Sequence, residues 1–182
     1  VDQVGGPQIR NIGTIGGNVC NGVTSADSAS SLFAYNAILE LTGPKGIRQV
    51  PIQEFYTGPG KTVRCHEEVM TAIRIRRRDY EGYTGCYIKY GKRNAMEIAT
   101  LGCACLVKLS LDKKVVEDMR IAYGVAAPTP VRCPETEKAV SGKAVSKALL
   151  LQTGKGVLNE VSPRTSWRAS KEFRLQLVEE LA

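Results

Sequence analysis

The chain contains little that would bind a metal ion or carry out acid–base catalysis. Its 182 residues include one histidine, His66, and six cysteines that form no CxxC pair, so a zinc site is not expected. There is no nucleophile triad, and no two carboxylates are paired at catalytic spacing. We therefore expect neither a metal centre nor a catalytic side chain.

Aromatic residues and long apolar runs are also scarce. Aromatics make up 6% of the chain and are not interleaved with basic residues, so the net charge of +7 is weak support for nucleic-acid binding. No apolar stretch is long enough to span a bilayer, and no signal segment is visible. The cysteines show no pairing pattern, which favours a reducing, cytoplasmic compartment. We expect no nucleic-acid or membrane partner.

One segment near the start of the chain stands out. Residues 8–18 read QIRNIGTIGGN and contain a glycine pair, Gly16 and Gly17. Paired glycines let the backbone approach a bulky anion and direct amides toward it, and the adjacent Thr14 and Asn18 supply further hydrogen-bonding groups. This chemistry suits a pyrophosphate, although by itself a Gly-Gly pair is more often only a turn.

The rest of the pattern predicts an α+β fold. A helix should start at Thr24 or Ser25 as its cap, with Asp27 in its first turn. Alternation and turn residues predict strands at 37–42, 47–52, 67–75, 85–90, 97–111 and 116–125, the last three forming an antiparallel meander that Pro128 and Pro130 stop. Cys103 and Cys105 would then share one face of a strand as core residues.

The polar segment 76–85 is interpreted as a linker, which divides the chain into domains 1–80 and 81–182. A dense basic run, Arg74 with Arg76–Arg78, overlaps the start of this segment. A solvated surface is its most common role, with a subunit contact or a nucleotide phosphate as the alternatives.

Beyond residue 134 the pattern becomes helical, with breaks expected at Gly142, Gly154 and Pro163. The last helix should carry an apolar stripe, facing the sheet, that consists of Ala169, Phe173, Leu177 and Leu181.

The segment 8–18 followed by TSAD at 24–27 resembles the FAD-binding subunits of molybdenum hydroxylases, a family that includes xanthine dehydrogenase flavin subunits and carbon monoxide dehydrogenase medium subunits. The resemblance continues at 87–99, 123–132 and 166–174, so it covers essentially the whole chain. The family has a further N-terminal region with a second glycine-pair loop that nothing here matches. Val1 is not an initiator methionine, so we expect a fragment or a processed piece.

The resemblance implies that the fold is the remainder of a two-subdomain FAD-binding domain, followed by a domain with a three-stranded antiparallel sheet packed with helices. It also implies a set of FAD contacts, namely Thr14, Ile15, Gly16, Gly17, Asn18, Asp27, Met70 and Lys89.

Within that set, Asp27 would hold a ribityl or ribose hydroxyl, Met70 would touch the cofactor through its backbone, and Lys89 would lie near the isoalloxazine ring. Without the resemblance, Asp27 reads as a helix-start residue and Lys89 as a surface lysine. Some relatives cover the ring with an aromatic residue where this chain has Val4.

The function implied is that of an oxidoreductase subunit. Purine hydroxylation would take place at a molybdenum cofactor on a second subunit, electrons would pass through iron–sulfur clusters on a third, and FAD here would hand them to NAD. With one phosphate loop missing, the chain alone should bind FAD weakly or not at all, since each unmade charged hydrogen bond costs about 1–3 kcal/mol. A structural or assembly module that docks the other subunits without FAD is the alternative.

Overall fold

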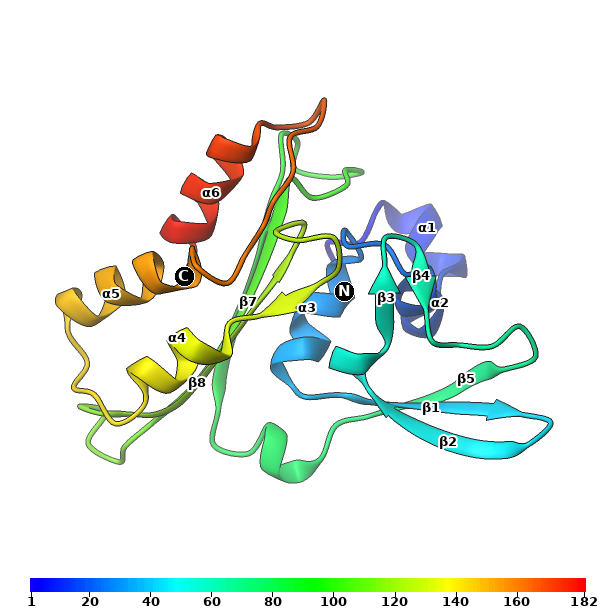
Figure 1. The fold of residues 1–182 in the computed structure, drawn as a ribbon, viewed down its shortest axis with the longest axis horizontal. Helices are drawn as coiled ribbons and strands as arrows, with labels where there is room; N and C mark the ends of the chain where they lie inside the picture. Colours follow the sequence, from blue (N-terminus) through cyan, green and yellow to red (C-terminus); the bar gives the residue numbers. More distant parts are fainter.

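The computed structural model describes residues 1–182, and Figure 1 shows helices and strands arranged around two main sheets. The helices are α1 (Pro7–Ile12), α2 (Ile15–Cys20), α3 (Asp27–Ala34), α4 (Pro134–Val140), α5 (Lys147–Val157) and α6 (Lys171–Glu180). The strands are β1 (Ile38–Gly43), β2 (Gly46–Pro51), β3 (Tyr56–Gly58), β4 (Lys61–Thr62), β5 (Val69–Arg74), β6 (Thr84–Tyr90), β7 (Leu101–Leu109), β8 (Val116–Gly124) and β9 (Val131–Arg132). None of the helices has the length and apolar character needed to cross a bilayer.

The first sheet has the antiparallel order β2-β1-β5. The predicted hairpin is confirmed, because β1 and β2 pair from Ile38 opposite Pro51 to Gly43 opposite Gly46. Gly46 has a φ of 102°, a conformation that favours glycine at this turn. The inner face of β1 contributes Leu39 and Leu41, both fully buried, to a core shared with α3.

The second sheet has the antiparallel order β6-β7-β8-β9. Its first three strands are the predicted meander. The short β9 was not predicted: it begins directly after Pro130 and pairs with β8 at Ala122 and Tyr123. Helix α3 packs against β7 and β8 on one face, and α4 and α6 pack against the sheet on the other (Figure 1).

The predicted cap of α3 is wrong, whereas Asp27 does lie in its first turn. The N-cap residue is Ala26, and it makes no side-chain cap. Thr24 instead bonds to the segment after β8, where its hydroxyl donates to the carbonyl of Ala127 at 3.0 Å and accepts from the amide of Val125 at 3.2 Å. The Thr24 hydroxyl, which the local pattern assigned to the helix cap, therefore makes a long-range contact instead.

Gly142 and Pro163 do lie between helices, but Gly154 lies inside α5 and is not a break. A Cβ added at Gly154 would come within 2.6 Å of the carbonyl oxygen of Glu179 in α6. The absence of a side chain at Gly154 therefore allows α5 and α6 to pack closely.

The predicted apolar stripe of α6 is only partly right. Leu177 is buried, but Phe173 is 38% exposed and contacts Tyr90 edge-on. Arg174 is also buried in this helix, where it donates to the carbonyls of Thr100 and Arg164 and to the hydroxyl of Ser166. Three neutral acceptors thus satisfy a buried cation, and burial lowers its pKa.

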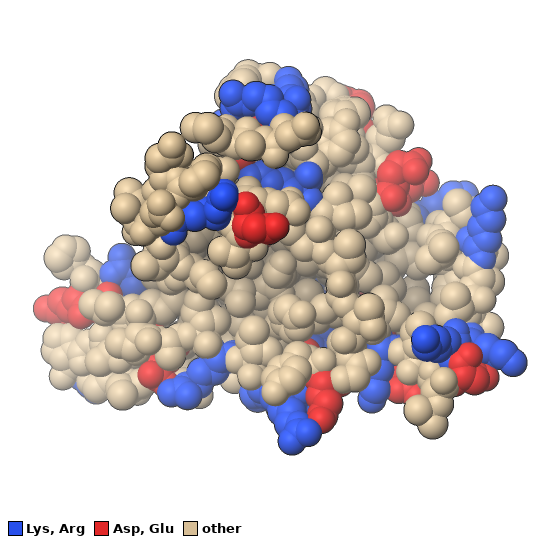
Figure 2. Space-filling model, turned by 180° about the vertical axis from the view of Figure 1, so that it is seen from behind, with Lys and Arg blue, Asp and Glu red and all other residues tan.

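The segment predicted as a linker is anchored to β8 of the second sheet and to the turn between α3 and β1. Asp79 is buried and accepts hydrogen bonds from Arg76, Asn36 and Arg120. The arginine run is mostly paired at the surface, with Arg74 on Glu40, Arg76 on Asp79 and Arg77 on Glu81. Figure 2 shows basic side chains scattered over the face in view and mixed with acidic ones, without one continuous basic patch.

Candidate functional site

The glycine pair lies in the first turn of α2. Thr14 is the N-cap residue, and its hydroxyl oxygen accepts from the amide of Gly17 at 2.9 Å. The sequence suggested an open loop, whereas the structure has a short helix in which one of the two expected amides is already bonded to Thr14. The cap explains the local conformation, since threonine readily accepts from an amide three residues on.

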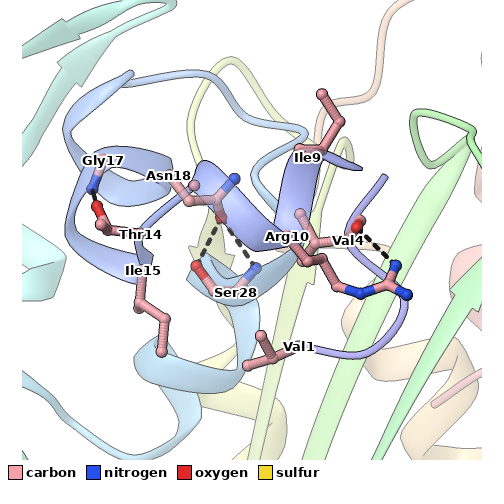
Figure 3. A pocket seen from close by; sticks show the side chains of 10 residues that line it. Val1, Val4, Ile9, Arg10, Thr14, Ile15, Gly17, Asn18 and Ser28 are labelled. Carbon is pink, nitrogen blue, oxygen red and sulfur yellow. Dashed lines mark hydrogen bonds between the residues drawn. The ribbon is translucent and has the colours of Figure 1, made fainter. Parts of the chain in front are cut away.

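A cavity of about 270 Å³ opens beside this turn (Figure 3). Its lining consists of Val1, Val4, Ile9, Arg10, Gly13, Thr14, Ile15, Gly17, Asn18 and Ser28. Asn18 is fixed in this wall because its Oδ1 accepts from the hydroxyl of Ser28 at 2.6 Å and from the amide of Ser28 at 3.3 Å. These bonds join α2 to the first turn of α3, as the dashed lines of Figure 3 show.

A second cavity, of about 280 Å³, shares Thr14 and Gly17 with the first. Its full lining is Thr14, Gly16, Gly17, Cys20, Arg64, Glu68, Val69 and Met70. Met70 of β5 approaches Gly16 closely, because a Cβ on that glycine would lie 3.7 Å from the Met70 sulfur. Five consecutive predicted residues and Met70, 52 or more positions away, therefore line adjoining cavities.

Arg64 is the residue of this site that sequence reasoning missed. Its Nη1 donates to the carbonyls of Cys65 and Glu68, whereas its Nε is buried without a hydrogen-bond partner. The carboxylate of Glu68, in the same cavity, is held by Arg48 in a two-point contact of 2.6 and 2.9 Å. No pattern around Arg64 marks it, because only the fold brings it beside the glycine pair.

Asp27 and Lys89 form a buried ion pair. The Lys89 ammonium lies 2.8 Å from Oδ2 of Asp27, and the two side chains are 8% and 10% exposed. Lys89 also donates to the carbonyls of Gln3 and Glu97, and the Tyr87 hydroxyl donates to Oδ1 of Asp27 at 3.3 Å. Burial, followed by the Asp27 carboxylate, raises the pKa of Tyr87.

The burial of this pair excludes the interpretation of Lys89 as a surface lysine. Asp27 precedes Ser28, the residue that binds Asn18, so the ion pair adjoins the first cavity through the start of α3. Lys89 itself borders a different cavity, of about 260 Å³, together with Gln3, Tyr90 and Glu97. The structure thus places the eight predicted residues in one region of the molecule, but not around one single cavity.

Comparison with known proteins assigns both parts of the chain. The family described as FAD binding domain in molybdopterin dehydrogenase matches residues 1–76, and the family described as CO dehydrogenase flavoprotein C-terminal domain matches residues 86–182. This chain belongs to the FAD-binding subunit family of the molybdenum hydroxylases.

Individual relatives agree with this assignment. The chain is 45% identical to the xanthine dehydrogenase FAD-binding subunit of Escherichia coli O157:H7, over 97% of this chain and 60% of that protein. It is 33% identical to the glyceraldehyde dehydrogenase medium chain of Sulfolobus acidocaldarius, over 98% of this chain and 62% of the relative.

A solved structure, carbon monoxide dehydrogenase from Hydrogenophaga pseudoflava, superposes with a TM-score of 0.91 at 30% identity. The superposition covers 98% of this chain and 61% of that one. The predicted α+β fold of this family is confirmed, and the chain spans about 60% of the length of the relatives it matches.

Proposed function

We propose that this chain is the FAD-binding part of an electron-transfer subunit in a xanthine dehydrogenase-type molybdenum hydroxylase. The 45% identity to a xanthine dehydrogenase FAD-binding subunit carries this proposal. The subunit receives electrons from an iron–sulfur subunit that serves a molybdenum-cofactor subunit, and it passes them to NAD in the cytoplasm during purine oxidation. Residues 1–80 form the flavin-binding domain, and residues 81–182 form the C-terminal domain.

The chemistry of the two adjoining cavities fits a dinucleotide with a pyrophosphate. The second cavity contains a glycine pair without side chains and an arginine whose Nε lacks a hydrogen-bond partner. Thr14 and Asn18 add a hydroxyl and an amide side chain. In the proposed complex, Gly16 and Gly17 give the phosphates room, Ile15 packs against the cofactor, and Arg64 supplies positive charge.

Three residues beyond the glycine turn have proposed roles toward the rest of FAD. When bound, the flavin supplies the electron transfer, and the protein orients it and adjusts its electrostatics. Lys89 provides a positive charge near the ring, and Asp27 holds that ammonium group in a fixed position. The long 3.3 Å contact from Tyr87 leaves Oδ1 of Asp27 able to accept from a ribityl hydroxyl. Met70 bounds the cavity on the β5 side.

FAD affinity tests the proposal. We expect the protein isolated with its partner subunits to contain FAD, and the 182-residue chain alone to bind it more weakly. Gly16→Val should lower FAD affinity at least about tenfold, a loss of about 1.4 kcal/mol. A Cβ at Gly16 meets only the Met70 sulfur at an ordinary 3.7 Å, so the protein should keep its far-UV circular dichroism.

Gly58→Val is the matched control, because a Cβ there has no neighbour within 4 Å and Gly58 lines neither cavity. Gly58→Val should leave FAD affinity unchanged. Unaltered FAD binding by Gly16→Val would refute the placement of the phosphates. A native protein that neither contains nor binds FAD, yet still binds its partner subunits, would refute the flavin function and favour the assembly module.

A further inference from the structure

Two cysteines face each other across the first pair of strands in the second sheet. Cys86 of β6 and Cys105 of β7 are direct partners in the antiparallel register, so their side chains share one face. The Cα atoms of such a pair lie about 4.5–5.5 Å apart, depending on the type of pair. Disulfides have Cα atoms about 4.4–6.8 Å apart, so the backbone separation of this pair is compatible with a disulfide.

The pair is open to small solutes because β6 is the edge strand of its sheet. Cys86 is exposed and Cys105 is half-buried, and both line a cavity of about 660 Å³. Val107 and Leu109 of β7 continue the wall of this cavity beyond the two thiols. A molecule the size of a peroxide can therefore reach Cys86 directly and Cys105 through the cavity.

The other four cysteines lack such a partner. Cys103 shares the face of Cys105 but is buried opposite Ile88 and Tyr123, and its thiol donates to the carbonyl of Leu181. Cys133 is buried in the same core, and Cys20 packs against the other core. Cys65 is exposed at the surface before β5 and forms no strand pair with another cysteine.

We propose that Cys86 and Cys105 are a redox-active pair that a peroxide oxidises to a disulfide. Cys86 gives up its thiol proton and its sulfur attacks hydrogen peroxide. The O–O bond breaks, Cys86 becomes a sulfenic acid, and the hydroxide that leaves combines with that proton to form water. The sulfur of Cys105 then displaces the hydroxyl group from Cys86, and its thiol proton leaves in a water molecule. Two thiols lose two electrons, the peroxide becomes two water molecules, and a reducing dithiol reverses the reaction.

The surroundings assign the order of the two steps. Burial, then the neighbouring Cys86 and Glu137, raises the pKa of Cys105 to about 11, so this residue stays a thiol until the second step. Cys86 is the more exposed of the two and meets the oxidant first. The proposed disulfide would attach the edge strand β6 to β7 at Cys86, three positions before Lys89 in the same strand.

Peptide mapping of the reduced native protein after treatment with equimolar hydrogen peroxide tests this proposal. We expect two of the six thiols to be lost and dithiothreitol to restore both. Trypsin places Cys86 in the peptide 79–89 and Cys105 in the peptide 94–108, so the disulfide appears as a link between them. Fragmentation between Cys103 and Cys105 identifies the linked sulfur.

Cys105→Ser should abolish the link and let a dimedone-reactive sulfenic acid accumulate at Cys86. Cys65→Ser is the matched control, since it removes another exposed thiol and should leave the link intact. Oxidation of Cys86 and Cys105 without a link between them, or a link of Cys86 to any other cysteine, would overturn the proposal. The wild-type map decides this even if a variant fails to fold.

Discussion

Replacing Lys89 with methionine measures what the buried ion pair between α3 and β6 contributes to stability. Methionine retains most of the apolar stem and removes the ammonium group, which in the native protein makes three contacts of 2.7–2.8 Å. The Asp27 carboxylate, 10% exposed, would keep only the 3.3 Å contact from Tyr87. Removing one partner of a buried pair costs about 3–5 kcal/mol of unfolding free energy. Because both side chains keep some exposure, we expect a loss of about 3 kcal/mol.

Urea unfolding followed by far-UV circular dichroism is the assay, because Trp167 is 81% exposed and would be a poor fluorescent reporter. The dependence of the unfolding free energy on urea concentration should stay constant, while the urea concentration at the midpoint of unfolding falls. Arg77→Met is the matched control: the pair of Arg77 with Glu81 is exposed, at 77% and 56%, and should contribute no more than about 0.5 kcal/mol.

Adding Asp27→Asn to Lys89→Met should recover part of the loss, since no unpaired buried charge would remain. A loss for Lys89→Met below about 1 kcal/mol, or equal to that of Arg77→Met, would show that water solvates this pair and would refute the reasoning.

Two further predictions concern packing and pH. Gly154→Val should cost at least about 2 kcal/mol of unfolding free energy, because its Cβ would lie 2.6 Å from the Glu179 carbonyl oxygen; an unchanged melting temperature would contradict this. Hydrogen bonds from Arg48 lower the pKa of Glu68 to about 2, so the stabilising contribution of this contact is complete above the unfolded pKa near 4.5 and is lost as the pH falls toward 2. Arg48→Met should therefore lower the urea midpoint at neutral pH and have little effect near pH 2.

Local pattern was sufficient where the structure depends on neighbours in the chain. The alternation around Val69–Arg74 and the turn at Gly43–Gly46 predicted β5 and the first hairpin, because period two and turn glycines act within a few residues. Cys103 was correctly assigned to the core for the same reason. The proximity of Met70 to the glycine pair came from the family resemblance and not from the pattern.

Long-range contacts explain what the sequence did not reveal. The guanidinium of Arg174 in α6 is satisfied by Thr100, Arg164 and Ser166, and no periodicity of the sequence indicates acceptors so far apart. Arg64 was missed for the same reason. A buried polar group is predictable only when its partners are, and here the folded chain alone brings them together.

The same contacts determine how the molecule responds to a mutation. Helix α3 belongs to the first domain by sequence, yet its core includes Ala104, Leu106 and Ala122 of the second sheet. The Asp27–Lys89 pair crosses the same boundary. Because one of the two cores and a buried ion pair include residues of both parts, the two parts should unfold together, and two-state analysis of the Lys89 variant is justified. The two family matches therefore divide the chain between residues 76 and 86, whereas the two parts depend on each other for stability.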